Sequence, residues 1–470
     1  MKDEMIVNRP TLTDIQERII ETDELYELLE SKSYKVLRQR LRDIPAPDLA
    51  ELMQDIEKGY HTLIFRLLSK SHAADVFVEL ESDVQRRLIE SFSEGELAAI
   101  LDEMYLDDTV DVIEEMPATV VKRIIKSSTP ENRGLINRLL KYPKDSAGAL
   151  MTTEYVKLSL DMTVADALAH VKNVAIDKET IYTCYVTDRE RHLIGIVTAK
   201  SLLLSDADAP IKSVMEENVV YADTTLNKEE VANLFNKYGF IALPVVDSEC
   251  RLVGIVTVDD AMDVMREEAE EDFARIAGIT PTETPYLKSS VFSIWLSRIP
   301  WLLLLMISAT FSSTILNRFE AALPAVLILF VPMLMDTGGN SGGQTSVTVI
   351  RSLSLGEIGT SDAWRVLWKE MRVGFITGLT LGAVAFGKVM LVDRLIMQNP
   401  DVTLIVAFAV SLALALTVAI SKLIGALLPI LARRVGFDPA VMASPFITTI
   451  VDAASLLLYF FIAAKIFALS

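Results

Sequence analysis

At 470 residues, with 51% hydrophobic residues and a mean hydropathy of +0.34, the chain is too long for one domain and too apolar for an ordinary soluble protein. Its formal net charge of −19 argues against nucleic acid as a partner, because nucleic-acid phosphates require a basic surface, and it makes cations natural partners. The acids are concentrated before Val291: the first 290 residues hold 33 Lys and Arg against 55 Asp and Glu, whereas the rest hold 12 against 9.

Residues 1–140 are predicted to form an all-α superhelix of short helices. Segments such as DLAELMQDIE and DVQRRLIESF place apolar residues three and four positions apart, and Pro45, Pro117 and Pro130 stand at the breaks between segments. The opening residues MKDEMIVNRP lack the apolar stretch of a signal peptide, so we expect the chain before Val291 to be cytoplasmic.

Residues 141–265 contain a duplication. The segment DRERHLIGIVTAKSLL near Gly195 recurs as DSECRLVGIVTVDDAM near Gly254, and each copy follows a β-branched run and a helix-like stretch. The periods predict strand, turn, strand and helix in each copy, so two small α/β units should pair. This pattern resembles a tandem of CBS domains, which commonly bind adenosine nucleotides.

That resemblance implies a nucleotide site, with ATP as a candidate cofactor, at Thr257 and Asp260 of the second copy. The first copy has Thr198 but carries Ser201 where the acid would stand, which counts against a site that depends on this copy. Capping of the following helices by the threonines explains the same residues without a nucleotide. The sequence leaves both interpretations open.

An acidic linker helix is predicted at residues 266–290, continuing an acidic stretch that starts earlier. DDAMDVMREEAEED, from Asp259 to Asp272, carries eight acids and one arginine. Such a stretch is commonly a solvated helix face. A second acidic cluster, LDDTVDVIEE, lies in the N-terminal domain, and two facing acidic surfaces would repel unless a divalent cation bridged them. The two clusters together therefore favour a cation sensor.

Residues 291–470 are predicted to form a polytopic α-helical membrane domain with five transmembrane helices. The apolar segments lie at about 294–316, 321–349, 373–392, 402–431 and 440–469, and each reaches the roughly 20 residues that a membrane crossing needs. An odd number of crossings places the C-terminus outside if the N-terminus is cytoplasmic. The loops that would then face inward carry most of the basic residues: Arg351, Arg365, Lys369, Arg372, Arg433 and Arg434.

The last apolar segment, ITTIVDAASLLLYFFIAAKIFAL, contains a carboxylate. At bilayer depth Asp452 costs about 2.5–3.5 kcal/mol, and the nearest cation on its helix, Lys465, is roughly 20 Å away. Ser444, Thr448 and Asp452 recur every four residues and share a helix face. Oxygen ligands without a nearby His or Cys point to a hard cation, Mg²⁺ or Ca²⁺, and an ion pathway is the leading explanation.

The second apolar segment carries FVPMLMDTGGNSGGQTS, four glycines around Asn340. Asp336, Asn340 and Gln344 recur every four residues, so they form a polar stripe on one helix face. A polar stripe at membrane depth favours a pore wall. Close packing of helices through small residues is the competing interpretation.

The order of these parts resembles the MgtE family of bacterial magnesium channels over essentially the whole chain. PMLMDTGGNSGGQTS and DPAVMASPFITTIVD match that family's two pore signatures. The resemblance implies a homodimer with the pore on its two-fold axis and a pore ion held by Asp452, Thr448, Ser444, Asn340 and Gly339. It also implies regulatory Mg²⁺ sites formed by Asp107, Asp111, Asp260, Asp263, Glu268, Glu271 and Asp272.

The sequence therefore predicts a Mg²⁺-selective channel or transporter of the cell inner membrane, with Mg²⁺ as both substrate and regulator. Uptake of Mg²⁺ would stop when cytosolic Mg²⁺ bridges the acidic N-terminal, CBS and linker surfaces. The four histidines are scattered and suggest no catalytic group, so no enzyme is predicted. Two alternatives remain: an ion-coupled secondary transporter of divalent cations, and a CBS-type membrane receptor that senses nucleotides.

Overall fold

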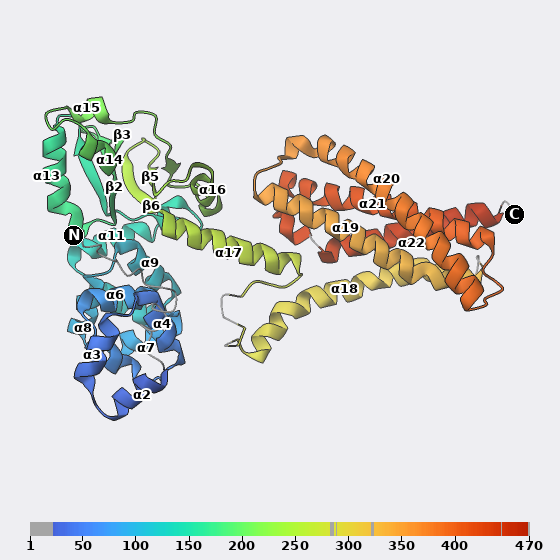
Figure 1. The fold of residues 1–470 in the computed structure, drawn as a ribbon, viewed down its shortest axis with the longest axis horizontal. Helices are drawn as coiled ribbons and strands as arrows, with labels where there is room; N and C mark the ends of the chain where they lie inside the picture. Colours follow the sequence, from blue (N-terminus) through green and yellow to red (C-terminus); the bar gives the residue numbers. More distant parts are fainter. Residues whose placement is uncertain (1–21, 283–285, 288, 321–323, 443, 469–470) are drawn as a thin grey trace, which may run out of the picture. The chain divides into compact units, whose positions relative to one another are not determined.

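The computed structural model describes residues 22–282, 286–287, 289–320, 324–442 and 444–468 (Figure 1). Two compact units divide the chain, one within residues 1–265 and the other within residues 266–470. The first combines short helices with two small sheets, and the second consists of long helices.

The N-terminal part of the first unit is a stack of short helices, as the sequence predicts, and the described residues from Thr22 onward form ten of them. Proline or serine begins several of them, and in α8 a capping box joins Ser93 and Glu96. Alternate helices pack on one another, α4 on α6, α6 on α8 and α8 on α10, around a core of buried leucines and isoleucines. The helices are α2 (Thr22–Glu30), α3 (Tyr34–Arg42), α4 (Ala46–Asp55), α5 (His61–Leu67), α6 (Lys70–Val78), α7 (Ser82–Ser91), α8 (Glu94–Leu101), α9 (Leu106–Glu115), α10 (Ala118–Ser127) and α11 (Pro130–Leu139).

The duplicated region forms two equivalent α/β units, each with a three-stranded sheet. In each sheet the first strand runs parallel to the second, and the second pairs antiparallel with the third. In chain order, the first of these α/β units contains α12 (Ala147–Leu150), β1 (Tyr155–Ser159), α13 (Val164–Val174), η1 (Ala175–Asp177), β2 (Thr180–Thr187), β3 (Leu193–Thr198), α14 (Ala199–Leu204) and α15 (Ile211–Val214). The second contains β4 (Ala222–Asp223), α16 (Lys228–Tyr238), β5 (Ala242–Val246) and β6 (Leu252–Thr257).

A small apolar cluster joins the two α/β units. Tyr185 of the first sheet packs against Ala242, Leu252 and Ile255 of the second, and all four side chains are buried. The two copies therefore fold as one pair, as the repeat predicts. In Figure 1, α9 and α11 lie between this pair and the lower helical stack, which places α9 against both parts.

The linker helix differs from the predicted range of 266–290. Helix α17 spans Val258–Ile276, so it begins directly after strand β6 and ends earlier than expected. No helix-breaking residue separates Thr257 from Ile276, which explains the early start. Gly278 explains the end, because its φ of +68° is left-handed and its backbone closes the helix through a bond from Ile279 N–H to the Ala274 carbonyl.

The second unit packs long helices around α21. They are α18 (Val291–Glu320), α19 (Val331–Ser354), α20 (Ala363–Lys388), α21 (Leu404–Val435) and α22 (Ser444–Ala468), with short turns η2 (Ala325–Phe330), η3 (Thr360–Asp362), η4 (Val389–Ile396) and η5 (Pro439–Met442). Helix α21 contacts α19, α20 and α22, and α19 also contacts α22 (Figure 1). Glycines allow these close approaches: a Cβ atom at Gly382 would meet the Ser411 carbonyl at 3.0 Å.

Four of the described helical stretches are long and apolar enough to cross a membrane, one fewer than the sequence predicts. They are Val291–Phe319, Thr360–Ile396, Leu404–Val435 and Phe446–Phe467. Helix α19 is not among them. It carries the glycines, Asp336, Asn340 and several hydroxyl residues, which reduce its hydropathy although it has 24 residues.

Candidate functional site

A cavity of about 270 Å³ lies in the first unit, where the helical stack meets the α/β pair. Helices α6 and α9, the loop before β2 and the start of α17 supply its walls. Among the described residues that line it there is no Lys, Arg or His, and eight are acids. We call it the acidic cavity, with the carboxylates Asp75, Glu79, Glu103, Asp107, Asp108, Glu179, Asp259 and Asp260.

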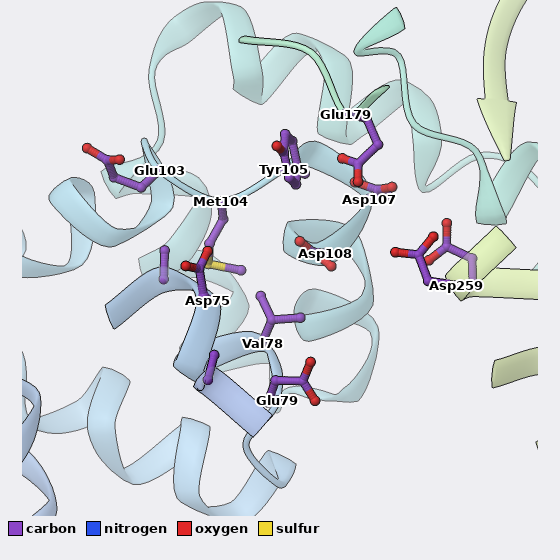
Figure 2. A pocket seen from close by; sticks show the side chains of 13 residues that line it. Asp75, Val78, Glu79, Glu103, Met104, Tyr105, Asp107, Asp108, Glu179 and Asp259 are labelled. Atoms are coloured by element: carbon purple, nitrogen blue, oxygen red, sulfur yellow. The ribbon is translucent and has the colours of Figure 1, made fainter. Parts of the chain in front are cut away.

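Asp107 is the most enclosed carboxylate of the acidic cavity. It is 7% exposed, and its Oδ1 atom has no hydrogen-bond partner. Figure 2 shows the Asp107 side chain close to Glu179, with Asp108 further into the cavity and Asp259 approaching from α17. A buried carboxylate oxygen without a donor is unfavourable, so this oxygen calls for a cation or for water.

Burial and mutual repulsion raise the pKa of these acids. Burial raises the pKa of Asp108 to about 7 and that of Glu179 to about 8, and neighbouring carboxylates add to both shifts. The pKa of Asp107 is raised well above its ordinary value by burial and by the charge of Asp260. Burial raises the pKa of Asp260 itself to about 6 although the Thr257 hydroxyl stabilises its charged form. At neutral pH the cavity therefore needs either protons or a cation.

A hydrated cation fits this chemistry better than a dehydrated one. Among the described residues, no three carboxylates, histidines or cysteines gather closely enough to bind a metal directly. Mg²⁺ loses its waters reluctantly and commonly keeps several of them. One water needs only about 10–15 Å³ of cavity volume. The acidic cavity, with about 270 Å³, therefore has room for an ion with its water shell.

The seven predicted regulatory acids are divided between the two units. Asp107 and Asp260 line the acidic cavity, and Asp111 lies one turn further along α9 with an exposed side chain. Asp263 is exposed on α17, and Glu268 lies further along that helix, in the second unit.

The other two predicted acids have partners within the second unit. Glu271 pairs with Arg275, and Asp272 accepts a hydrogen bond of 3.1 Å from the Ser354 hydroxyl. Arg275 also pairs with Asp438, in the loop before η5. The end of α17 is thus bound to α19 and to the loop before η5.

The predicted pore residues meet where α19 passes α22. A Cβ atom on Gly339 would lie 2.8 Å from Thr448 Cγ2 and 3.9 Å from Asp452 Oδ1, so the absence of a side chain at Gly339 leaves room beside the carboxylate. The Asn340 amide donates a hydrogen bond of 3.1 Å to Asp336 Oδ1. We call this surface, formed by Asp336, Gly339, Asn340, Thr448 and Asp452, the Asp452 wall.

The polar stripe predicted on α19 is exposed in the single chain. Asp336, Asn340 and Gln344 are all solvent-accessible, whereas the neighbouring Gly338 and Ser341 are buried. Ser444 is the first residue of α22, but its side chain lies outside the described part of the structure. The structure thus brings together Gly339, Thr448 and Asp452, with Asn340 beside them.

Comparison with known proteins decides the family. A family model described as "Divalent cation transporter" matches residues 331–462, "MgtE intracellular N domain" matches residues 44–145, and two CBS domains match residues 147–208 and 211–267. The "Magnesium transporter MgtE" of Thermus thermophilus is 36% identical over 445 residues, covering 93% of this chain and 97% of that protein. The Bacillus subtilis protein of the same description is 31% identical and covers 93% of this chain and 95% of its own length.

This chain belongs to the MgtE family. The predicted family resemblance and the tandem CBS pair are therefore confirmed. Among solved structures, "the cytosolic domain of the Mg2+ channel MgtE in complex with ATP" is similar at 36% identity with a TM-score of 0.50, covering 52% of this chain and 100% of that one. These similarities place the chain in a family of transporters.

The CBS threonines of this MgtE protein are occupied by local hydrogen bonds. The Thr257 hydroxyl donates to Asp260 Oδ2 at 2.6 Å, and Thr198 accepts from the Ser201 backbone N–H at 3.1 Å. Thr198 therefore caps α14, as the alternative interpretation predicts. A nucleotide phosphate at Thr257 would have to displace the bond to Asp260.

Several site residues of this MgtE protein escaped sequence reasoning. Glu179 joins the acidic cavity from the loop before β2, and no local pattern marks it. Lys422 had a signal, because it stands inside the fourth apolar segment, where a lysine is as costly as Asp452. In the structure it is buried in α21, 7% exposed, and its Nζ donates to the Thr345 hydroxyl of α19 at 3.3 Å.

Proposed function

We propose that this chain is a Mg²⁺-selective channel that carries Mg²⁺ into the cytosol through a pore lined by the Asp452 wall. One observation carries the proposal: α19 and α22 bring Asp452, Thr448 and the bare backbone of Gly339 together, on helices that we take to cross the membrane. Relatives of 31–36% identity over most of the chain are described as magnesium transporters. The Asp452 carboxylate, with Thr448, Ser444 and Asn340, would hold the waters of a hydrated ion rather than the bare ion.

The pore requires a second copy of the chain. In one copy the polar stripe of α19 is exposed, and polar side chains facing lipid are unfavourable. A homodimer with its two-fold axis along the stripe would cover it and place two Asp452 carboxylates around one path. Oxygen ligands from two subunits would then share a single Mg²⁺ ion.

We extend the proposal to five membrane crossings. At 1.5 Å per residue the 24 residues of α19 are about 36 Å long, enough to cross the hydrocarbon core beside the four more apolar spans. With a cytoplasmic N-terminus, the C-terminus then lies outside, and the protein is a multi-pass protein of the cell inner membrane. The working domain boundaries are 1–140, 141–265, 266–290 and 291–470.

Closure by cytosolic Mg²⁺ completes the proposed mechanism. Mg²⁺ in the acidic cavity would neutralise Asp107 and Asp260 and hold the helical domain, the CBS pair and the start of α17 together. In the last turn of α17, Arg275 pairs with Asp438, the first residue of the second pore signature. The remaining acids, Asp111, Asp263, Glu268, Glu271 and Asp272, would extend the regulatory surface along α9 and α17.

An adenosine nucleotide is the second ligand that we propose for the cytosolic part. The support is a relative of 36% identity whose cytosolic domain was solved in complex with ATP. In this chain, Thr257 and Asp260 would contribute to binding. ATP would modulate the channel, because no residue group that hydrolyses a nucleotide is predicted.

Flux into liposomes tests the pore. The purified chain should take up Mg²⁺ under an inward-negative potential without a proton or sodium gradient, and Asp452→Ala should lower the flux about 100-fold or more, since two charged ligands are lost per pore. Asp401→Asn, an exposed carboxylate in the loop before α21, is the matched control and should conduct normally. Wild-type flux in Asp452→Ala would sink the pore assignment, and strict dependence on a proton or sodium gradient would favour a secondary transporter.

A further inference from the structure

A chain of hydrogen bonds crosses three helices of the membrane unit behind the Asp452 wall. Lys422 Nζ on α21 donates to the Thr345 Oγ1 atom on α19 at 3.3 Å, and the Thr345 hydroxyl donates to Glu370 Oε2 on α20 at 3.0 Å. Lys422 and Thr345 are 7% and 3% exposed. Thr345 thus accepts from the lysine and donates its single hydroxyl proton to the glutamate, so it links the two charged side chains.

We propose that Lys422, Thr345 and Glu370 form a polar bridge that sets the position of α19, with Lys422 and Glu370 as positioning residues for Mg²⁺ passage. The role in passage rests on the proposed function, since α19 is taken to line the pore. The bridge itself rests on the observed bonds alone.

The bridge acts on the side of α19 that turns away from the polar stripe. At about 100° per residue, Thr345 lies roughly 140° around the helix from Asn340 and about 9 Å along it from Gly339. Lys422 therefore holds α19 from behind and stays out of the ion path, where a second cation would repel Mg²⁺. Shifting α19 would move Gly339 relative to Asp452.

Packing alone fixes the register of α19 on α21 weakly at this point. The two helices meet through glycines: a Cβ atom at Gly342 would lie 3.1 Å from the Ser421 carbonyl, and one at Gly425 would collide with the Gly342 backbone. Bare backbones approach closely but interlock few side chains. The hydrogen bonds of Thr345, one turn from Gly342, supply the directional contact that the glycines cannot provide.

The burial of Lys422 makes the bridge sensitive to removal of one partner. A buried charge that loses its partner is more damaging than the removal of both charges together. Ordinary packing makes the opposite prediction: Lys422→Met, which keeps most of the length of the side chain and replaces its charge with apolar surface, would then be neutral or favourable.

Mg²⁺ uptake by the full-length protein in liposomes, measured over a range of external Mg²⁺, tests the bridge. Lys422→Met and Glu370→Gln should each lower maximal flux about tenfold without changing the Mg²⁺ concentration at half-maximal flux by more than about twofold. The double variant Lys422→Met/Glu370→Gln should recover most of the flux. Thr345→Ser should behave as wild type, whereas Thr345→Val should match the single variants. Lys465→Met, an exposed lysine of α22, is the control and should conduct normally.

Wild-type flux in Lys422→Met would overturn the bridge, and so would a double variant that is worse than either single one. Thermal unfolding of the same variants in detergent gives a readout that is independent of transport. The double-mutant cycle should show that the two single losses are not additive. A wild-type chain without flux would overturn the proposed function and the role in passage, and additive unfolding losses would overturn the bridge even if flux is normal.

Discussion

The acidic cavity and the Asp452 wall place carboxylates in opposite surroundings. In the cavity, eight acids share about 270 Å³, and no basic residue is among the described residues that line it. In the wall, Asp452 stands beside Thr448 and a glycine, with Asp336 engaged by the Asn340 amide. In the cavity a cation would relieve the repulsion among the carboxylates. The wall offers fewer ligands, which suits an ion that is proposed to pass through.

This difference teaches how one ion can be both regulator and substrate. In the proposed mechanism, the many converging carboxylates of the cavity would bind Mg²⁺ firmly enough to hold two protein surfaces together, and the binding energy would appear as a change of conformation. A single carboxylate per subunit that contacts the ion through water binds more weakly and allows passage. Substitutions that alter one region at a time can therefore separate the two roles.

The Asp452 wall should be sensitive to a single methyl group. Gly339→Ala would place a Cβ atom 2.8 Å from Thr448 Cγ2, so α19 and α22 must separate or the space beside Asp452 must narrow. Overpacking of this kind costs about 1–3 kcal/mol, equivalent to a roughly 5- to 150-fold effect, and we expect a loss of Mg²⁺ flux in that range. Liposome uptake is the measurement.

Gly343→Ala is the matched control for Gly339→Ala, because a Cβ atom at Gly343 meets nothing within 4 Å and the helix is the same. It should retain normal flux. Equal losses in the two variants would mean that glycine is needed along α19 for backbone reasons, and the special role of Gly339 beside Asp452 would be refuted.

The acidic cavity should loosen as the pH rises. The folded pKa values of Asp108, Glu179 and Asp260, about 7, 8 and 6, lie above the values near 4 of unfolded chains, so the stability associated with their protonation is lost as pH increases from about 4 to 8. Amide hydrogen exchange in α9 of the full-length protein, corrected for intrinsic rates, should therefore accelerate about tenfold between pH 5.5 and 8 without Mg²⁺.

Added Mg²⁺ should remove most of that pH dependence, because the ion replaces the protons. The exchange of α18 amides, which belong to the other unit, serves as the internal reference and should not follow the same pH profile. Protection of α9 that is constant or rises with pH in the absence of Mg²⁺ would contradict the account of the cavity.

The smallest effect concerns the hydroxyl that supports Asp260. Thr257→Val removes the 2.6 Å hydrogen bond to Asp260, which favours the protonated acid and should weaken Mg²⁺ binding in the cavity. A hydrogen bond worth about 0.5–1.5 kcal/mol corresponds to a two- to tenfold rise in the internal Mg²⁺ that halves the flux. Thr198→Val is the same change in the first copy, where Ser201 replaces the acid, and should shift nothing. Equal shifts would indicate a general loss of CBS stability.

Much of the fold was predictable because its signals are local. The repeat around Gly195 and Gly254 predicts two equivalent α/β units, and the four-residue spacing on α19 predicts the exposed polar stripe that the structure shows. The predicted range of the linker helix was wrong at both ends. The helix starts early because no helix-breaking residue follows Thr257, and it ends early because Gly278 adopts a left-handed conformation.

The sites were predictable only in part. Asp452 and Lys422 are equally conspicuous as charged residues within apolar segments. The role of Lys422 follows only from its link to Thr345 and, through Thr345, to Glu370, which lie on other helices. Glu179 reaches Asp107 through tertiary folding, so spacing along the chain cannot reveal it. The nucleotide and capping interpretations of Thr257 differ in the hydrogen-bond partner of its hydroxyl. The sequence does not specify that partner, which is Asp260 in the structure.

One titration tests most directly whether the acidic cavity regulates the channel while the Asp452 wall conducts Mg²⁺. Mg²⁺ flux should be measured against internal Mg²⁺ for the wild type, for Asp107→Asn/Asp260→Asn, and for the exposed CBS control Asp206→Asn. We predict that the cavity variant keeps the wild-type maximal flux but needs at least about tenfold more internal Mg²⁺ to close, since each lost charge weakens the ion's binding by at least about 1 kcal/mol. Unchanged closure, or a loss of maximal flux without a shift in closure, would contradict it.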